Sequence, residues 1–301
     1  EVYTYTKTGM LETVKDKRGI TKYQYDSRDR LVRVDNPDGS WIEYNYDKVG
    51  NKIKVTTPNG KTTYEYDALN RLEKVTDALG NETRYTYDPV GNRESIVNAN
   101  GIITEYKYDK LNRLVKLVNK NTSGEILSSY EYELGEAGNR TKVTENNGRV
   151  IEYAYDDLYR LVSETISEPD ADSRVVYYEY DKVGNRLSKK DNEDTTLYVY
   201  DENDRLTEDG KYEYKYDNNG NVIEKTDGTV IEKYVYDYQN RLVSVIVTDG
   251  ETTKKTEYCY DSDGIMIKKV TDGVKSTYIV DNSGEYSQIL EEINEEGKPV
   301  V

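Results

Sequence analysis

The sequence predicts an all-β protein built from tandem antiparallel β-hairpins, and three observations support this fold class. A Tyr-x-Tyr-Asp unit recurs along the chain, tyrosine occurs 32 times while phenylalanine is absent, and turn residues separate segments rich in β-forming residues. Two tyrosines one residue apart lie on the same face of a strand because strand side chains alternate. We therefore expect a continuous sheet, curved or spiralling, that forms part of a hollow shell.

The repeated unit occurs in twelve copies that use 24 of the 32 tyrosines, and the sixth copy ends in glutamate. A repeat this regular predicts one single array over 1–301, with a degenerate first copy in 1–20, clear copies in 21–275 and a degenerate last copy in 276–301. The copies are Tyr23/Tyr25/Asp26, Tyr44/Tyr46/Asp47, Tyr64/Tyr66/Asp67, Tyr85/Tyr87/Asp88, Tyr106/Tyr108/Asp109, Tyr130/Tyr132/Glu133, Tyr153/Tyr155/Asp156, Tyr178/Tyr180/Asp181, Tyr198/Tyr200/Asp201, Tyr214/Tyr216/Asp217, Tyr234/Tyr236/Asp237 and Tyr258/Tyr260/Asp261.

Two kinds of turn alternate after the acidic residue, so the structural period is predicted to be two units. Odd copies continue into Arg-Leu, at Arg30, Arg71, Arg113, Arg160, Arg205 and Arg241. We expect these arginines to pair with turn carboxylates or to lie over a tyrosine face. Even copies carry a turn glycine, followed by Asn in all but the last, at Gly50, Gly91, Gly138, Gly184, Gly220 and Gly264.

Each acidic residue is expected to begin the turn, with its carboxylate accepting a hydrogen bond from the backbone two residues on. The turn glycines, and Asn70, Asn112 and Asn240 in odd copies, suit a positive φ. The returning strand, for example Leu31-Val32-Arg33-Val34, alternates imperfectly, which indicates a β-bulge after the turn. A second set of turns such as Asn36-Pro37-Asp38-Gly39 closes the other end of each hairpin. Only residues 287–294 have a pattern that allows a helix.

The residue between the two tyrosines predicts the character of the opposite face of the sheet. It is often polar in the first half of the chain, as at Gln24 and Asn45, and small or apolar later, as at Ala154 and Val235. We therefore expect that face to become drier toward the C-terminus. Cys259 occupies the same position and is expected to be a packed thiol.

Composition excludes several classes of function. The net charge of −16 argues against nucleic acid and anionic membranes as partners. No stretch approaches the roughly 18 apolar residues of a membrane span, and no leader is recognisable at the first residues. One cysteine excludes an internal disulfide.

No catalytic or metal site is expected. The absence of histidine excludes Ser-His-Asp and Cys-His nucleophilic systems, and the carboxylates that could form an acid pair are explained by the repeat. Asp261-x-Asp263-Gly264 and Asp217-x-Asn219-Gly220 resemble calcium loops faintly but lack the required ligand spacing, so turn chemistry explains them better. We expect no enzyme activity and no cofactor.

Twelve Tyr-x-Tyr-Asp units, some continuing as Asp-x-x-Gly-Asn-Arg (88–93 and 181–186), closely resemble the YD repeats of Rhs proteins, of insecticidal toxin-complex B and C components and of teneurins. The resemblance covers essentially the whole chain. It implies a long sheet that spirals into a hollow cocoon and, in bacterial members, encloses a variable C-terminal toxin. Residues 278–290 resemble the segment that precedes the end of such a core. Asp88-Pro89-Val90-Gly91 matches the family's self-cleavage motif only superficially, because it lies in an ordinary repeat turn.

We therefore expect a non-catalytic, secreted or cell-surface segment that forms a shell or scaffold around a toxin or other cargo, with neighbouring shell segments as partners. The alternative is an extracellular adhesion module that binds a glycan or a cell-surface protein through its tyrosine-rich face, because flat rings stack on sugars. Recurrence of the tyrosine pair in every copy favours a structural role, in which rings from successive hairpins stack across strands.

Overall fold

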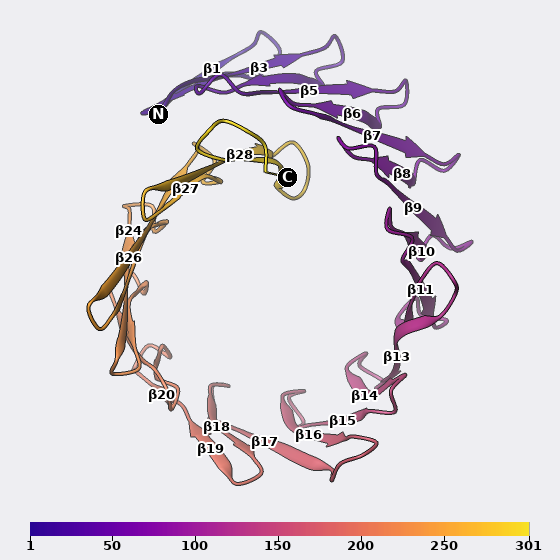
Figure 1. Ribbon diagram of the computed structural model, residues 1–301, viewed down its shortest axis with the longest axis vertical. Helices are drawn as coiled ribbons and strands as arrows, with labels where there is room; N and C mark the ends of the chain where they lie inside the picture. The colour runs from indigo at the N-terminus through magenta and orange to yellow at the C-terminus, as the bar shows by residue number, and fades with distance from the viewer. Residues whose placement is uncertain (301) are drawn as a thin grey trace. The chain divides into compact units, whose positions relative to one another are not determined.

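In the computed structural model, which describes residues 1–300, the chain is all-β, as predicted, and none of these residues is helical. The strands follow one another as antiparallel hairpins (Figure 1). They fall into two compact units, Glu1–Gly80 with Tyr214–Val301, and Asn81–Glu213. Residue 301, the end of the predicted single array, lies outside the described residues.

The first unit contains both ends of the chain, and its consecutive strands pair antiparallel within each segment. Its strands are β1 (Val2–Tyr5), β2 (Leu11–Asp16), β3 (Gly19–Tyr25), β4 (Leu31–Asp35), β5 (Trp41–Tyr46), β6 (Lys52–Thr56), β7 (Lys61–Tyr66), β8 (Leu72–Thr76), β22 (Glu213–Tyr216), β23 (Val222–Thr226), β24 (Val230–Tyr236), β25 (Leu242–Asp249), β26 (Thr252–Tyr260), β27 (Met266–Thr271), β28 (Val274–Asp281) and β29 (Gln288–Ile293).

The second unit continues the same pattern with shorter strands toward its end. Its strands are β9 (Glu82–Tyr87), β10 (Arg93–Val97), β11 (Ile103–Tyr108), β12 (Leu114–Lys120), β13 (Ile126–Leu134), β14 (Arg140–Glu145), β15 (Val150–Tyr155), β16 (Leu161–Ser167), β17 (Arg174–Tyr180), β18 (Arg186–Asp191), β19 (Asp194–Leu197), β20 (Val199–Tyr200) and β21 (Leu206–Glu208).

The sheet that we expected to be continuous is interrupted at Tyr198, because β19 and β20 belong to different hydrogen-bonded sheets. The Tyr198 backbone N–H donates to the carbonyl of Leu187 at 3.0 Å, and Leu187 is the extra residue of a bulge in β18. Because Ser188 pairs with Leu197, this bond extends the β18–β19 pairing by one residue, and the ladder ends there.

Returning strands carry the predicted bulge wherever their register is described. In the first copy Tyr25 pairs with Leu31 while Gln24 pairs with Arg33, so Val32 is the extra residue. The same shift recurs in later hairpins, where Tyr46 pairs with Lys52 and Asn45 with Lys54. The bulge bends the returning strand, and pairing with the next hairpin resumes two residues later, at Arg33 in β4.

The bulge leaves a backbone carbonyl outside the ladder, and the second tyrosine of the next copy binds it. The Tyr46 hydroxyl donates to the Leu31 carbonyl at 2.7 Å. The same bond joins Tyr25 to Leu11, Tyr66 to Lys52, Tyr155 to Arg140, Tyr180 to Leu161, Tyr200 to Arg186 and Tyr260 to Leu242. A phenylalanine ring would fill the same gap between hairpins but would leave the carbonyl without this donor.

The most deeply buried cluster lies in the first unit, where the C-terminal hairpin β28–β29 covers the tyrosine face of the early strands. Ile42 and Val55 of the early strands and Ile279 of β28 are at most 2 % exposed. Residues 287–294, where a helix was allowed, instead contain β29, because this segment pairs with β28 from Ile293 to Gln288. Tertiary pairing therefore overrides the local pattern.

The tyrosine-to-carbonyl bond predicts a specific cost for removing one hydroxyl. Tyr46→Phe should lower the free energy of unfolding by about 1 kcal/mol, because the Leu31 carbonyl loses its donor. Urea denaturation followed by circular dichroism measures this. The control is Tyr238→Phe, whose side chain is 89 % exposed and which should leave stability unchanged; equal effects of the two substitutions would contradict the interpretation.

Candidate functional site

The repeated site is the corner, which we define as the five residues from the aspartate after the second tyrosine to the first residue beyond the turn. The second tyrosine ends a strand in eleven of the predicted copies, namely β3, β5, β7, β9, β11, β15, β17, β20, β22, β24 and β26 among the described residues, and the aspartate follows directly. The predicted turn glycines and Asn70, Asn112 and Asn240 all have positive φ. A three-residue loop with one such residue is typical of a type I turn with a bulge.

Odd corners are closed by an arginine on the aspartate. The Asp26 Oδ1 accepts the backbone N–H groups of Arg28 and Arg30 at 2.8 and 3.1 Å. Its Oδ2 accepts Arg30 Nε at 2.8 Å and Nη2 at 2.7 Å. This two-point contact between guanidinium and carboxylate confirms the predicted pairing and restricts both side chains.

Even corners use asparagine in place of arginine. The Asp47 Oδ1 accepts the backbone N–H groups of Val49, Gly50 and Asn51, and its Oδ2 accepts Asn51 Nδ2 at 2.9 Å. One carboxylate thus satisfies most of the donors of the turn, which explains why the acidic residue recurs.

Neighbouring corners are linked by two alternating hydrogen bonds, and these explain the two-unit period. An odd corner donates from arginine Nη1 to the first carbonyl of the next corner, as Arg30 does to Asp47 at 3.0 Å and Arg160 to Asp181 at 2.9 Å. An even corner donates from asparagine Nδ2 to the side-chain oxygen of the residue with positive φ in the next corner. Asn51 Nδ2 donates in this way to Asn70 Oδ1 at 3.0 Å. The corners therefore form a hydrogen-bonded rim along one edge of the sheet.

Guanidinium groups also cover the tyrosine rings. The Arg30 guanidinium carbon lies 4.7 Å from the centre of the Tyr46 ring. Arg186 lies near two rings, 5.7 Å from that of Tyr178 and 4.6 Å from that of Tyr198. These contacts confirm that arginines lie over tyrosine faces, and they occupy ring faces that a sugar would need.

Most corners lower the pKa of their aspartate. The bond from the Arg30 side chain is the main cause that holds the pKa of Asp26 below its usual value. At Asp47, loss of solvation acts in the opposite direction, but the backbone N–H groups of Gly50 and Asn51 outweigh it, so the pKa of Asp47 is also lowered. Asp26 and Asp47 are therefore ionised carboxylates near neutral pH.

A second site joins the two ends of the chain within the first unit. We call it the buried acidic contact, and it consists of Asp281 and Glu291, which are 4 % and 5 % exposed, with their partners. The Asp281 carboxylate accepts the Tyr44 hydroxyl at 2.8 Å and Lys52 Nζ at 2.9 Å. Hydrogen bonds from Ser283, Lys52 and Tyr44 overcome burial and lower the pKa of Asp281.

Glu291 forms the other half of this contact on β29. Its carboxylate accepts the Thr57 hydroxyl and both the backbone N–H and the side-chain Nδ2 of Asn59, the last at 2.6 Å. Two buried carboxylates from the last hairpin thus bind the turn and strands of 44–59. A buried charge is retained only when it is paired in this way.

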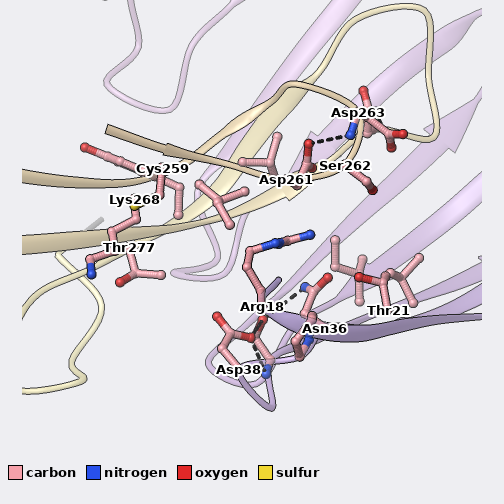
Figure 2. Close-up of a pocket in the computed structure, with 18 of the residues that line it drawn as sticks. Arg18, Thr21, Asn36, Asp38, Cys259, Asp261, Ser262, Asp263, Lys268 and Thr277 are labelled. Atoms are coloured by element: carbon pink, nitrogen blue, oxygen red, sulfur yellow. Dashed lines mark hydrogen bonds between the residues drawn. The ribbon is translucent and has the colours of Figure 1, made fainter. Parts of the chain in front are cut away.

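A pocket of about 380 Å³ lies beside the buried acidic contact in the same unit. Figure 2 shows that strands and turns near Arg18, Thr21 and Asn36 form one wall, and residues around Cys259, Asp261 and Lys268 form the other. Burial, and then the carboxylates of Asp263 and Asp261, raise the pKa of the Tyr23 hydroxyl in its lining to about 12. Burial also raises the pKa of Asp261, whose corner carries Ile265 where other corners place a side-chain donor.

Three expectations from the sequence are wrong. Cys259 is exposed rather than packed. The opposite sheet face does not become drier, because Ala154 is exposed and Val199 and Val235 are each 47 % exposed. These side chains alternate with buried-face tyrosines and have no layer over them that would exclude water.

The third error concerns the sixth copy, where the corner begins at Gly135 and not at Glu133. The Gly135 N–H donates to the Asn139 carbonyl at 2.8 Å, and Leu134 pairs with Arg140 in the place of a second tyrosine. Tyr132 therefore takes the place of the first tyrosine. In other even copies the glycine follows the acidic residue by three positions, and this spacing from Gly138 would have located the corner.

Among residues 1–300, no group of three or more metal-ligating side chains is present. The loop at 261–265, which resembles a calcium loop, makes the bonds of an ordinary corner, since the Asp261 carboxylate accepts the Asp263 and Ile265 N–H groups. The described part of the chain also contains no helix with the length and apolarity that a bilayer span requires.

Comparison with known proteins supports a repeat architecture of shell type. The teneurin YD-shell family model matches residues 136–299, and the RHS repeat model matches 46–82, 70–103 and 87–123. No curated protein matches the chain.

Solved structures that resemble the chain include TcdB2-TccC3 and the Tc holotoxin pore of Photorhabdus luminescens with the TccC3 mutation D651A. Each is 15% identical, with TM-scores of 0.47 and 0.48. The match covers 99% of this chain and 22% of those chains, so the chain spans about a fifth of their length.

The buried acidic contact predicts that Asp281→Asn will loosen the C-terminal hairpin. The amide places an N–H group toward the Lys52 ammonium and removes the opposite charge, so the free energy of unfolding should fall by about 2–3 kcal/mol. Backbone amides of β28 and β29 should exchange with deuterium faster. Asp170→Asn, in an exposed turn, is the control; unchanged exchange in Asp281→Asn would contradict the role of this contact.

The lowered pKa values of the corner aspartates, such as Asp26 and Asp47, predict acid sensitivity. Their unfolded pKa is about 3.9, so the unfolded chain takes up protons first as pH falls. The stabilisation is therefore complete above about pH 5 and is lost as pH falls through the lower folded values. The urea midpoint should be constant from pH 7 to 5 and drop below pH 4, and a flat profile down to pH 3 would be inconsistent with it.

Proposed function

Because the chain belongs to the teneurin YD-shell family, we propose that it is a non-catalytic wall segment of a secreted shell that encloses a C-terminal toxin or other cargo. Members of this family are structural shell repeats. As in the sequence-based prediction, we treat the whole chain as one array and its corner residues as structural. Neighbouring shell segments and the cargo are the proposed partners.

The observation that carries this proposal is the alternating link between corners. Hairpins within a unit are joined by ladder bonds and, in many cases, also by a tyrosine hydroxyl and by a corner bond such as that from Arg160 to the Asp181 carbonyl. Such redundancy makes hairpins joined in this way rigid relative to one another, which is what a wall requires. It also uses the aspartates, arginines and asparagines of the corners for structure, which supports a non-catalytic role.

The C-terminal hairpin supports the tyrosine face as the side that meets the cargo. β28 and β29 lie on this face of the early strands, bound through Asp281 and Glu291. A polypeptide that follows the last hairpin would therefore be delivered to the same face. Because guanidinium groups lie over several ring faces, a sugar-binding platform gains no support from the geometry.

Protease protection tests the enclosure. A flexible, polar, protease-sensitive segment fused after Val301 should be cleaved at least about tenfold more slowly than the same segment fused before Glu1, because the first follows the hairpin that covers the tyrosine face. Cleavage is followed by mass spectrometry at a fixed protease concentration. Equal rates at the two ends would contradict the proposal.

Two further arms make the result specific. A crosslinker placed at Tyr64, on the tyrosine face of the first unit, should capture the C-terminal segment, whereas one at the neighbouring exposed Glu65 should not. Asp281→Asn should reduce protection if the buried acidic contact directs the segment to this face.

A further inference from the structure

An exposed row of apolar side chains follows the corners of the second unit. The third residue of a corner lies at the tip of its turn, and in five successive corners of the second unit it is apolar, as it also is at Val49 and Leu69 in the first unit. We call these residues the apolar row: Val90, Leu111, Ala137, Leu158 and Val183. The four larger side chains are between 70% and 72% exposed, and Ala137 is also exposed.

The links between corners place these residues side by side along one edge of the sheet. Asn92 Nδ2 donates to Asn112 Oδ1 at 2.9 Å, Arg113 Nη1 to the Gly135 carbonyl at 3.1 Å, and Arg160 Nη1 to the Asp181 carbonyl at 2.9 Å. Successive hairpins are two strand spacings apart, about 10 Å. The apolar row is therefore a stripe with a period of about 10 Å.

Turn formation does not require an apolar residue at this position. Later corners carry Asn203, Asn219, Gln239 and Asp263 there, and the corner of Asn203 makes the same turn, with the Asp204 N–H donating to the Asp201 carbonyl at 3.1 Å. Single exposed apolar residues are ordinary, but a contiguous set on one edge marks an interaction surface.

Tyr159 provides a second, independent sign of function in the apolar row. It follows Leu158 and has a φ of 59°, at the corner position where Asn112, Asp204 and Asn240 stand elsewhere. A bulky residue in the left-handed region is strained, and such strain persists mainly where a function requires it. The Tyr159 side chain is 63 % exposed, so most of it is available to a partner.

The order of residues in the row is the same in both directions, with Ala137 at its centre. A twofold axis through Ala137 would place Leu111 of one copy against Leu158 of the other, and Val90 against Val183. The residues before the two leucines are Lys110 and Asp157, so this arrangement would also bring opposite charges together. Self-complementarity of this kind is the requirement for a twofold symmetric interface.

We propose that the apolar row is a dimerisation surface whose partner is a second copy of this chain. A second array has the same period of about 10 Å, so it stays in register over all five corners. Because the two corners run antiparallel across the axis, Tyr159 of each copy then lies opposite Lys110 of the other. The one unfavourable contact is between the two Glu136 side chains, which precede Ala137 and meet near the axis.

Sedimentation velocity of the full chain over a range of concentrations tests this proposal. We expect a reversible monomer–dimer equilibrium that Leu158→Glu weakens at least about tenfold, because each dimer would bury two new charges. Leu79→Glu is the matched control. Leu79 is 88 % exposed in the turn between β8 and β9, which is not a corner, so this substitution should leave the dimer affinity unchanged. A monomer at every concentration, or equal effects of the two substitutions, would overturn the proposal.

Charge substitutions near the proposed axis test the twofold arrangement. Lys110→Glu and Asp157→Lys should each weaken the dimer, and the double exchange should restore it, whereas Glu136→Gln should strengthen it. Failure of the double exchange to restore association would exclude this register.

Tyr159→Asn separates strain from association. It should raise the urea midpoint of the monomer, because asparagine tolerates the left-handed backbone, while it weakens the dimer. An increase in stability without any loss of association would argue against a contact role for Tyr159. Because these measurements concern association between copies, their failure can be distinguished from failure of the protease test of enclosure.

Discussion

The structure depends on one interaction, the hydrogen bond from the second tyrosine of a hairpin to a carbonyl of the hairpin before it. The bulge that follows each corner separates the returning strand from its next neighbour and leaves this carbonyl outside the ladder. A tyrosine fills the gap with its ring and satisfies the carbonyl with its hydroxyl, as Tyr46 does for Leu31. This double task explains why tyrosine and not phenylalanine stands at the second position of copies such as those of Tyr25, Tyr46 and Tyr260.

The corners add a second level of order to this ladder. Arginine and asparagine both bind the corner aspartate, but they reach different acceptors in the next corner, a backbone carbonyl in one case and the side chain of a left-handed residue in the other. Alternation of the two therefore lets successive corners donate to their neighbours without competition for the same acceptor. A rim of this kind resists shear between hairpins, which suits a wall better than a flexible array.

Local features of the fold could be predicted because local chemistry determines them. The aspartate turn, the positive φ of Gly50 and Asn70, the bulge and the arginine contact all depend on residues within a few positions of one another. The sixth copy is an exception, because its tyrosine pair indicates a corner at Glu133 whereas the spacing to Gly138 locates the corner at Gly135. The exposure of Cys259 could not be predicted from alternation alone, since that depends on whether another layer covers the face.

The buried acidic contact cannot be predicted from the sequence, and the reason is different. Tyr44 and Asp281 are 237 positions apart, and neither residue departs from the repeat pattern in a way that marks the other. Asp281 stands where any copy would place its aspartate, yet its burial makes it part of the core. Only the packing of the last hairpin on the first strands distinguishes it from the solvent-exposed corners.

The most direct test of the tyrosine-to-carbonyl bond is a carbon-13 spectrum of the chain labelled at leucine carbonyls. Leu11, Leu31, Leu161 and Leu242 are the leucine acceptors of these bonds. Replacement of Tyr46 by phenylalanine should move the Leu31 carbonyl resonance upfield and leave the other three in place. An unmoved Leu31 resonance would show that the hydroxyl does not bind this carbonyl, and the account of the repeat would fail with it.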